Sequence, residues 1–149
     1  MRFRLALVTL AGMAMLSSCA RRPEDVPMMA PSIVGVWEPV ELPAGALPCT
    51  GGGRIAYAAD GTVVIRSGAQ LLRGTYKVTP LPDGRFDVAV KLFEHNGELN
   101  CQGFSATFVM EHTPPTITVE RKGNELNTCF PGAPPICFRS ALRPELHGA

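Results

Sequence analysis

Short runs in which apolar and polar residues alternate, separated by turn residues about every ten positions, constrain the fold of this chain more than any other feature. The segment 86–92 is the clearest case, because its even positions hold Phe, Val, Val and Leu while Asp87, Ala89 and Lys91 occupy the odd ones. Such alternation is typical of a strand with one buried and one solvated face. No stretch of useful length has helical periodicity, so the pattern predicts an all-β fold.

The expected strands cover residues 33–40, 54–58, 62–66, 71–78, 86–92, 104–110 and 117–119, followed by two short strands around Cys129 and Cys137. Eight or nine strands with mostly short sequential connections favour a single antiparallel up-and-down β-barrel over residues 33–143, because closure removes the unpaired edges of a sheet. A two-sheet β-sandwich is the alternative. Charged outward residues such as Asp87 and Lys91 argue against a transmembrane barrel.

The composition narrows the class of protein. The chain has 149 residues, of which 46% are hydrophobic and 18% charged, and its formal net charge is +1. These values exclude a disordered chain and a strongly basic nucleic-acid-binding protein. If residues 1–18 are removed as a signal peptide, as argued below, twelve basic and thirteen acidic residues remain. We therefore expect no electrostatic steering of the protein toward polyanions.

The amino-terminal residues predict export. Arg2 and Arg4 precede an apolar run at Leu5–Leu16, and Ser17 and Ser18 are the small residues expected before a cleavage site. The run would span only about 18 Å as a helix, against a hydrocarbon thickness of about 30 Å. The segment is therefore predicted to be a signal peptide and not a permanent membrane span.

The residues that follow change the expected relation to the membrane, because Leu16-Ser17-Ser18-Cys19 resembles the lipobox of bacterial lipoproteins. The resemblance implies that Cys19 carries diacylglycerol after signal cleavage and that the lipid holds the chain in the membrane. Ala20 in place of Asp implies sorting to the outer membrane, on its periplasmic face. The alternative is an ordinary secretory signal that leaves Cys19 as a free thiol.

Two segments flank the predicted barrel. Residues 19–32 contain Pro23, Pro27 and Pro31 and predict a semi-extended tether, since proline cannot donate to a strand ladder. Residues 144–149 are expected to form a disordered tail.

Four cysteines remain once Cys19 is assigned to lipid. An even number in an oxidising compartment predicts two disulfides. We favour Cys129 with Cys137, which closes a proline-rich loop, and Cys49 with Cys101; the rival pairing joins Cys49 to Cys137 and Cys101 to Cys129. The spacings contain no C-x₂-C element, so we expect no metal site.

Three short motifs resemble those of lipocalin-like proteins: Gly-Val-Trp at 35–37, Asp-Gly-Thr at 60–62 and Gly-Thr-Tyr at 74–76. The resemblance implies a barrel whose end is plugged by Trp37 beside Gly35, with a basic residue of the last strand across the ring. Arg139 is the expected residue and Arg143 the second choice; such a contact contributes about 0.5 to 2 kcal/mol. The alternative is that Trp37 is an ordinary core aromatic.

A barrel of this size either is filled by side chains or leaves room for one small ligand. The side chains expected to line its interior are Tyr76, Phe86, Val88, Val90, Phe104, Ala106 and Phe108. The loop 42–53, which includes three consecutive glycines, is the longest connection and the expected contact surface.

Residues with catalytic potential do not form a recognisable pattern. His95, His112 and His147 lie in turns or in the tail, and Ser67, Ser105 and Ser140 lack a G-x-S-x-G context. The carboxylates considered are Glu94, Glu98 and Glu111, and no spacing pairs them. We therefore expect neither an enzyme nor a cofactor.

Two functions remain. The first is a lipid-anchored envelope lipoprotein that binds a small apolar ligand inside a lipocalin-like barrel. The second is a non-enzymatic interaction or inhibitor module that meets an envelope protein through exposed loops, similar in size, anchor and disulfides to lysozyme-inhibitor lipoproteins. No nucleic-acid partner is expected.

Overall fold

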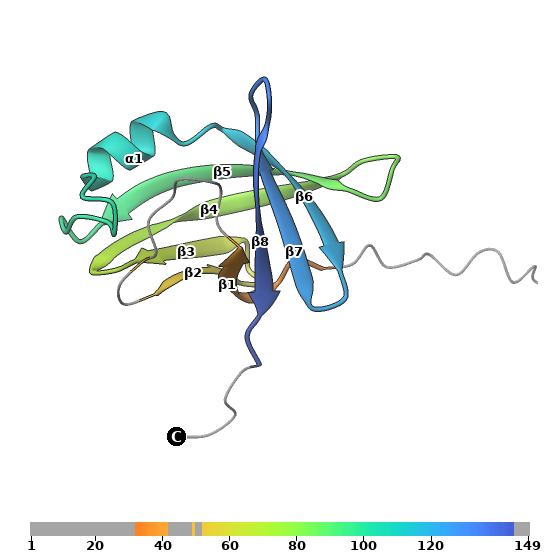
Figure 1. Cartoon of the computed structure of the whole chain (residues 1–149), viewed down its shortest axis with the longest axis horizontal. Coiled ribbons are helices and arrows are strands. Elements are labelled where there is room, and N and C mark those ends of the chain that lie inside the picture. Colours follow the sequence, from red (N-terminus) through yellow and green to blue (C-terminus); the bar gives the residue numbers. More distant parts are fainter. Residues whose placement is uncertain (1–31, 42–48, 50–51, 145–149) are drawn as a thin grey trace, which may run out of the picture.

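The computed structural model of the chain describes residues 32–41, 49 and 52–144 (Figure 1). The predicted signal peptide, the lipobox with Cys19, nearly all of the tether, most of the 42–53 loop and nearly all of the tail lie outside the described residues. Among the residues it describes, no helix is both long enough and apolar enough to cross a membrane.

The described residues form a closed antiparallel barrel in which each strand pairs with the next along the chain and β8 pairs with β1 (Figure 1). The predicted up-and-down barrel is confirmed, and the sandwich alternative is wrong. The elements are β1 (Gly35–Glu41), β2 (Gly53–Tyr57), β3 (Thr62–Ser67), β4 (Gln70–Pro80), β5 (Phe86–His95), α1 (Ala106–His112), β6 (Thr116–Lys122), β7 (Glu125–Phe130) and β8 (Ile136–Leu142).

The antiparallel order gives the barrel two distinct ends. The turns after β2, β4 and β6 lie at the end where β1 begins, which we call the Trp37 end. The connections after β1, β3, β5 and β7 lie at the opposite end, which we call the loop end. The longest of the described connections, residues 96–115, joins β5 to β6 and contains α1.

Alternation along the strands builds the core. Phe86 and Val88 of β5 are 3% and 0% exposed, and their partners Val119 and Ile117 on β6 are also buried. The buried cluster is Ile33, Trp37, Tyr57, Val63, Phe86, Val88, Ile117, Val119 and Leu126. Each strand therefore supplies one apolar face to the interior, as the sequence pattern predicts.

One expected strand is a helix. Residues 104–110 alternate in hydrophobicity, but the structure forms α1 at 106–112. Ser105 caps this helix, because its hydroxyl accepts a hydrogen bond from the backbone N–H of Phe108 at 3.2 Å. Only Ala106 of the helix is buried. The apolar residues at 104 and 108 are also four apart, so they fit one face of a helix as well as one face of a strand.

The Gly-Thr-Tyr motif marks an irregular point in the sheet. The register between β4 and β5 shifts between Arg73 and Gly74, as at a β-bulge. A Cβ at Gly74 would collide with the backbone carbonyl of Lys91 on the neighbouring strand. Glycine is therefore required here for close approach of two backbones, and the motif has a structural cause.

Candidate functional site

Trp37 belongs to the buried core and lies near the start of β1. Its side chain is fully buried, and the indole Nε1 donates a hydrogen bond to the Ile33 carbonyl at 2.8 Å. Gly35 has φ +140°, and a Cβ there would lie 2.5 Å from Cδ1 of Leu142. The glycine thus allows β1 to pass close to β8 beside the tryptophan.

The basic residue over the tryptophan is Arg121 of β6, whose Cζ lies 5.3 Å from the ring centroid. The expectation that Arg139 covers the ring is wrong. Arg139 follows Phe138 and precedes the buried Ser140, so its side chain faces outward, 3.3 Å from the Glu41 carboxylate and 3.5 Å from that of Glu125.

The second choice, Arg143, pairs instead with Glu38 at 2.6 Å. Arg121 also donates to the Ser32 carbonyl and, at 2.9 Å, to that of Gly123. The sequence contained a signal for it: Arg121 continues the inward face of Ile117 and Val119 to the end of β6.

Both disulfides lie at the loop end. Cys49 pairs with Cys101 and Cys129 with Cys137, with Cα separations of 5.1 and 4.1 Å. The favoured pairing is confirmed and the rival pairing is wrong. Cys129 and Cys137 are directly opposite on β7 and β8. Cys101 belongs to the connection after β5, so its bond to Cys49 ties that connection to the β1–β2 loop.

Polar side chains hold the connection 96–105 against the barrel. Gln70 is 1% exposed, and its amide donates to the carbonyls of Glu98 and Phe104 at 3.0 and 3.2 Å. Asn96 accepts from the Leu71 amide at 3.0 Å and donates to the Ala69 carbonyl at 2.9 Å. These contacts satisfy buried groups and fix the loop to the β3–β4 turn.

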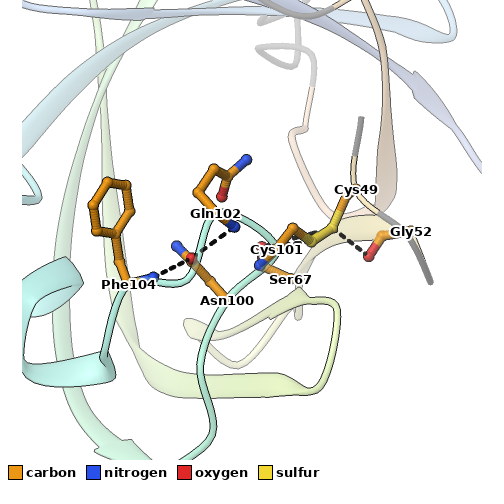
Figure 2. The surroundings of a disulfide bond; sticks show 7 residues. All are labelled: Cys49, Gly52, Ser67, Asn100, Cys101, Gln102 and Phe104. Carbon is orange, nitrogen blue, oxygen red and sulfur yellow. Dashed lines mark hydrogen bonds between the residues drawn. A yellow bond between two sulfur atoms is a disulfide. The ribbon is translucent and has the colours of Figure 1, made fainter. Parts of the chain in front are cut away.

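The disulfide and its surroundings stiffen the same connection (Figure 2). Ser67 donates to Sγ of Cys101 at 3.2 Å and accepts from the Cys101 amide at 3.4 Å. Asn100 folds back on its own loop, where its side-chain oxygen accepts from the amides of Gln102 and Phe104 at 3.0 and 2.8 Å (Figure 2). These contacts therefore fix the position of the backbone just before α1.

Stacked aromatic rings form an exposed row on α1 and in the loop just before it. The ring centroids of Phe104 and Phe108 are 4.8 Å apart, and those of Phe108 and His112 are 4.0 Å apart. We call these three residues the aromatic row. The side chains of Phe104 and Phe108 are 46% and 41% exposed. Phe93 and Leu99, in the same part of the chain, are 58% and 55% exposed. α1 lies alongside β5 (Figure 1).

Two of the side chains expected to line the barrel interior belong instead to the aromatic row. Phe104 and Phe108 are exposed, because Phe108 is on α1 and Phe104 is in the loop before it, and neither belongs to a strand of the barrel. The other expected lining residues, Tyr76, Phe86, Val88, Val90 and Ala106, are buried or half-buried, and the first four belong to the core or pack against it.

Two tyrosines form part of this packing. Tyr57 and Tyr76 make an edge-to-face contact with ring centroids 4.9 Å apart, and the Tyr76 hydroxyl donates to the Ala58 carbonyl at 2.7 Å. Burial raises the pKa of the Tyr57 hydroxyl. Desolvation and, next, the charge of Asp60 raise the pKa of Tyr76. Both hydroxyls therefore stay protonated at neutral pH.

Several of the candidate catalytic side chains make structural contacts or are buried, and His147 lies outside the described residues. His95 accepts from the Gly97 amide at 3.1 Å, Ser67 contacts the disulfide, and Ser140 is buried on β8. Among the residues that the structure describes, no hydrogen bond or ion pair joins a histidine to Ser67, Ser105, Ser140, Glu94, Glu98 or Glu111. Within the same residues, no three His, Cys, Asp or Glu side chains gather as ligands for a metal.

Comparison with protein-family models, with curated proteins and with solved structures gave no match. The barrel is thus assigned from its own strand order and register.

Proposed function

We propose that this chain is a lipid-anchored envelope module that binds a partner protein through the loop end of its barrel. The observation that carries the proposal is the aromatic row, an exposed stack of rings on a short helix and on the loop just before it. Exposed apolar patches on small proteins commonly mark interaction sites, and aromatic residues dominate binding energy at interfaces.

Preorganisation supports the same interpretation. The connection 96–105 is held by a disulfide, by Gln70 and by two asparagines, and Ser105 caps the helix that follows. A surface that is rigid before binding loses little conformational entropy when a partner docks. The row therefore has the properties expected of a recognition element and not of a mobile loop.

The charges around the row indicate the chemistry of the partner. Residues 92–115 contain Glu94, Glu98 and Glu111, all exposed, and no lysine or arginine. The segment that carries the apolar rings thus has acidic side chains and no lysine or arginine. We propose a partner that offers an apolar groove with basic residues at its rim, because opposite potentials favour the correct encounter. This interaction involves no catalytic step.

The lipid anchor completes the proposal. The lipobox-like residues at 16–19 support attachment through Cys19 at the periplasmic face of the outer membrane, and two disulfides suit an oxidising compartment. Metabolic labelling with a fatty-acid analogue tests this part: wild type should incorporate label and Cys19→Ser should not. Equal labelling of both chains would contradict the anchor.

The aromatic row can be tested in the full chain by crosslinking in the envelope. A Phe104→Ser/Phe108→Ser variant should lose at least about tenfold of the crosslinked partner, since two aromatic anchors contribute at least about 1.4 kcal/mol. Val34→Ser is the matched control, because Val34 is 39% exposed and lies near the Trp37 end. Equal partner yield from the double variant and wild type would overturn the proposal.

A second candidate is the binding of a small apolar ligand inside the barrel, as the lipocalin-like resemblance implies. It is favoured by apolar side chains that pack against the core without being fully buried, including Ile65, Val90 and Leu92. Native mass spectrometry of protein purified from membranes should then show a bound small molecule that is lost in Leu92→Trp, which would fill the space. Recovery of wild type without such a molecule would contradict this candidate.

A further inference from the structure

The cations of the described residues fall into two groups. Arg85, Lys122, Arg139 and Arg143 form ion pairs, and Arg121 lies over Trp37. The remaining cations form no ion pair with a described residue, and all of them lie on adjacent strands β2 to β5. These are Arg54, Arg66, Arg73, Lys77 and Lys91, which we call the basic strip.

The strand register makes the basic strip continuous. Arg54 is directly opposite Arg66, which is a diagonal neighbour of Arg73 on β4. Lys91 is directly opposite Thr75, between Arg73 and Lys77 on β4. All five residues are exposed and alternate with inward residues, so they share the outer wall. Cross-strand and diagonal neighbours lie about 5 to 8 Å apart at Cβ. The strip therefore crosses the wall without a gap.

Folding by itself does not account for this arrangement. Like charges directly opposite each other on neighbouring strands destabilise a sheet, and Arg54 and Arg66 form such a pair. Two carboxylates share the wall, Asp87 and Glu94, yet Asp87 accepts from Thr118 and Glu94 makes no ion pair with Arg73 opposite it. The five cations are thus available to an external anion.

The outer wall has a cavity beside two cations of the basic strip, Lys77 and Lys91. A shallow cavity of about 220 Å³ is lined by Thr75, Tyr76, Lys77, Ala89, Val90 and Lys91. Four of these residues are exposed, so the cavity opens on the outer wall between the two lysines. Small side chains therefore separate the cations, and an anionic group can reach both ammonium groups.

We propose that the basic strip docks the barrel wall on a bilayer surface that carries anionic headgroups, an inference that rests on the lipid anchor of the proposed function. A row of five cations matches an extended anionic surface, whereas a single small anion would meet only two of them. Each cation near such a surface strengthens binding by about fivefold. A lipid chain and a basic patch together also give the two signals that stable attachment requires.

The chain contains its own control for a test, because it has only three lysines. Lys77 and Lys91 belong to the basic strip, whereas Lys122 is on β6 and pairs with Glu120 at 2.9 Å. The full lipidated chain is reconstituted in neutral phosphatidylcholine vesicles or in vesicles with phosphatidylglycerol. The rate at which an amine-reactive reagent labels each lysine is then measured by mass spectrometry.

We expect Lys77 and Lys91 to react at least about fivefold more slowly on anionic than on neutral vesicles, and Lys122 to react equally on both. The protection should disappear in 1 M salt, where the Debye length is about 3 Å. Equal rates for Lys77 and Lys91 on both vesicles would overturn the proposal. Equal protection by inorganic phosphate on neutral vesicles would also overturn it, because the site would then bind a small anion.

A variant strengthens the test. In Arg54→Gln/Arg66→Gln the fraction of anionic lipid that gives half of the protection should rise by at least about twofold, because two cations are lost. Arg139→Gln is the matched control, since that cation is already paired. An unchanged midpoint in the double variant would contradict the strip. Failure of the anchor is seen separately, as chain that does not float with neutral vesicles.

Discussion

Single residues decide how the chain packs around Trp37. Gly35 allows β1 to approach Leu142, the buried indole bonds to Ile33, and Arg121 covers the ring. The lipocalin-like motif at 35–37 predicted a basic residue over Trp37, and the structure has one, but on β6 instead of the last strand. The cation depends on which side chain reaches the ring, and the inward face of β6 brings Arg121 there.

The two arginines should differ in their effect on stability. Arg121→Gln should lower the free energy of unfolding by about 1 to 3 kcal/mol, because it loses a cation–π contact and hydrogen bonds to two backbone carbonyls. Arg139→Gln should cost less than about 1 kcal/mol, since its ion pairs are exposed. Denaturant unfolding of both variants measures this difference. A larger loss for Arg139→Gln would show that the assignment over Trp37 is incorrect.

At the scale of elements, α1 is the one that the sequence pattern assigned wrongly. Its apolar residues satisfy both a strand period and a four-residue helical spacing, and Ser105 before them supplies a cap. β6 pairs with β5 only from Thr116 onward, so residues 104–110 are not part of the sheet. The helix therefore stays outside, and its rings are exposed.

Loss of the cap should act on the helix alone. Ser105→Ala should destabilise α1 by about 1 kcal/mol, because the Phe108 amide loses its acceptor. Hydrogen exchange should then accelerate at 106–112 while the strand amides keep their protection. Thr107→Ala is the control, an exposed residue of the same helix that caps nothing. Equal acceleration throughout the barrel would mean that α1 is part of the cooperative core.

For the whole molecule, both disulfides lie at the loop end, whereas the buried Trp37 packs in the core near the opposite end. The two bonds close loops of different length, with separations of 52 and 8 residues. The longer closure removes more freedom from the unfolded chain. We therefore expect the bond between Cys49 and Cys101 to contribute more to stability.

Removing each bond tests this order. Cys49→Ser/Cys101→Ser should lower the free energy of unfolding by about 4 kcal/mol, and Cys129→Ser/Cys137→Ser by about 2.5 kcal/mol. The second pair also joins strands that already hydrogen-bond to each other. Denaturant midpoints of the two double variants under oxidising conditions give the comparison. A greater loss for the shorter loop would contradict the chain-entropy explanation.

Strand alternation was enough to favour a closed barrel, because burial of one face per strand and closure of sheet edges are local and general demands. The number of cysteines predicted two disulfides, and the folded structure decided between the two pairings. The helix at 106–112, the cation over Trp37 and the segregation of charge could not be read in the same way. A nearly neutral composition conceals that ion pairs occupy other strands while five cations share one wall. Such features arise from which residues become neighbours, and neighbours across a barrel are set by register and closure of the folded chain.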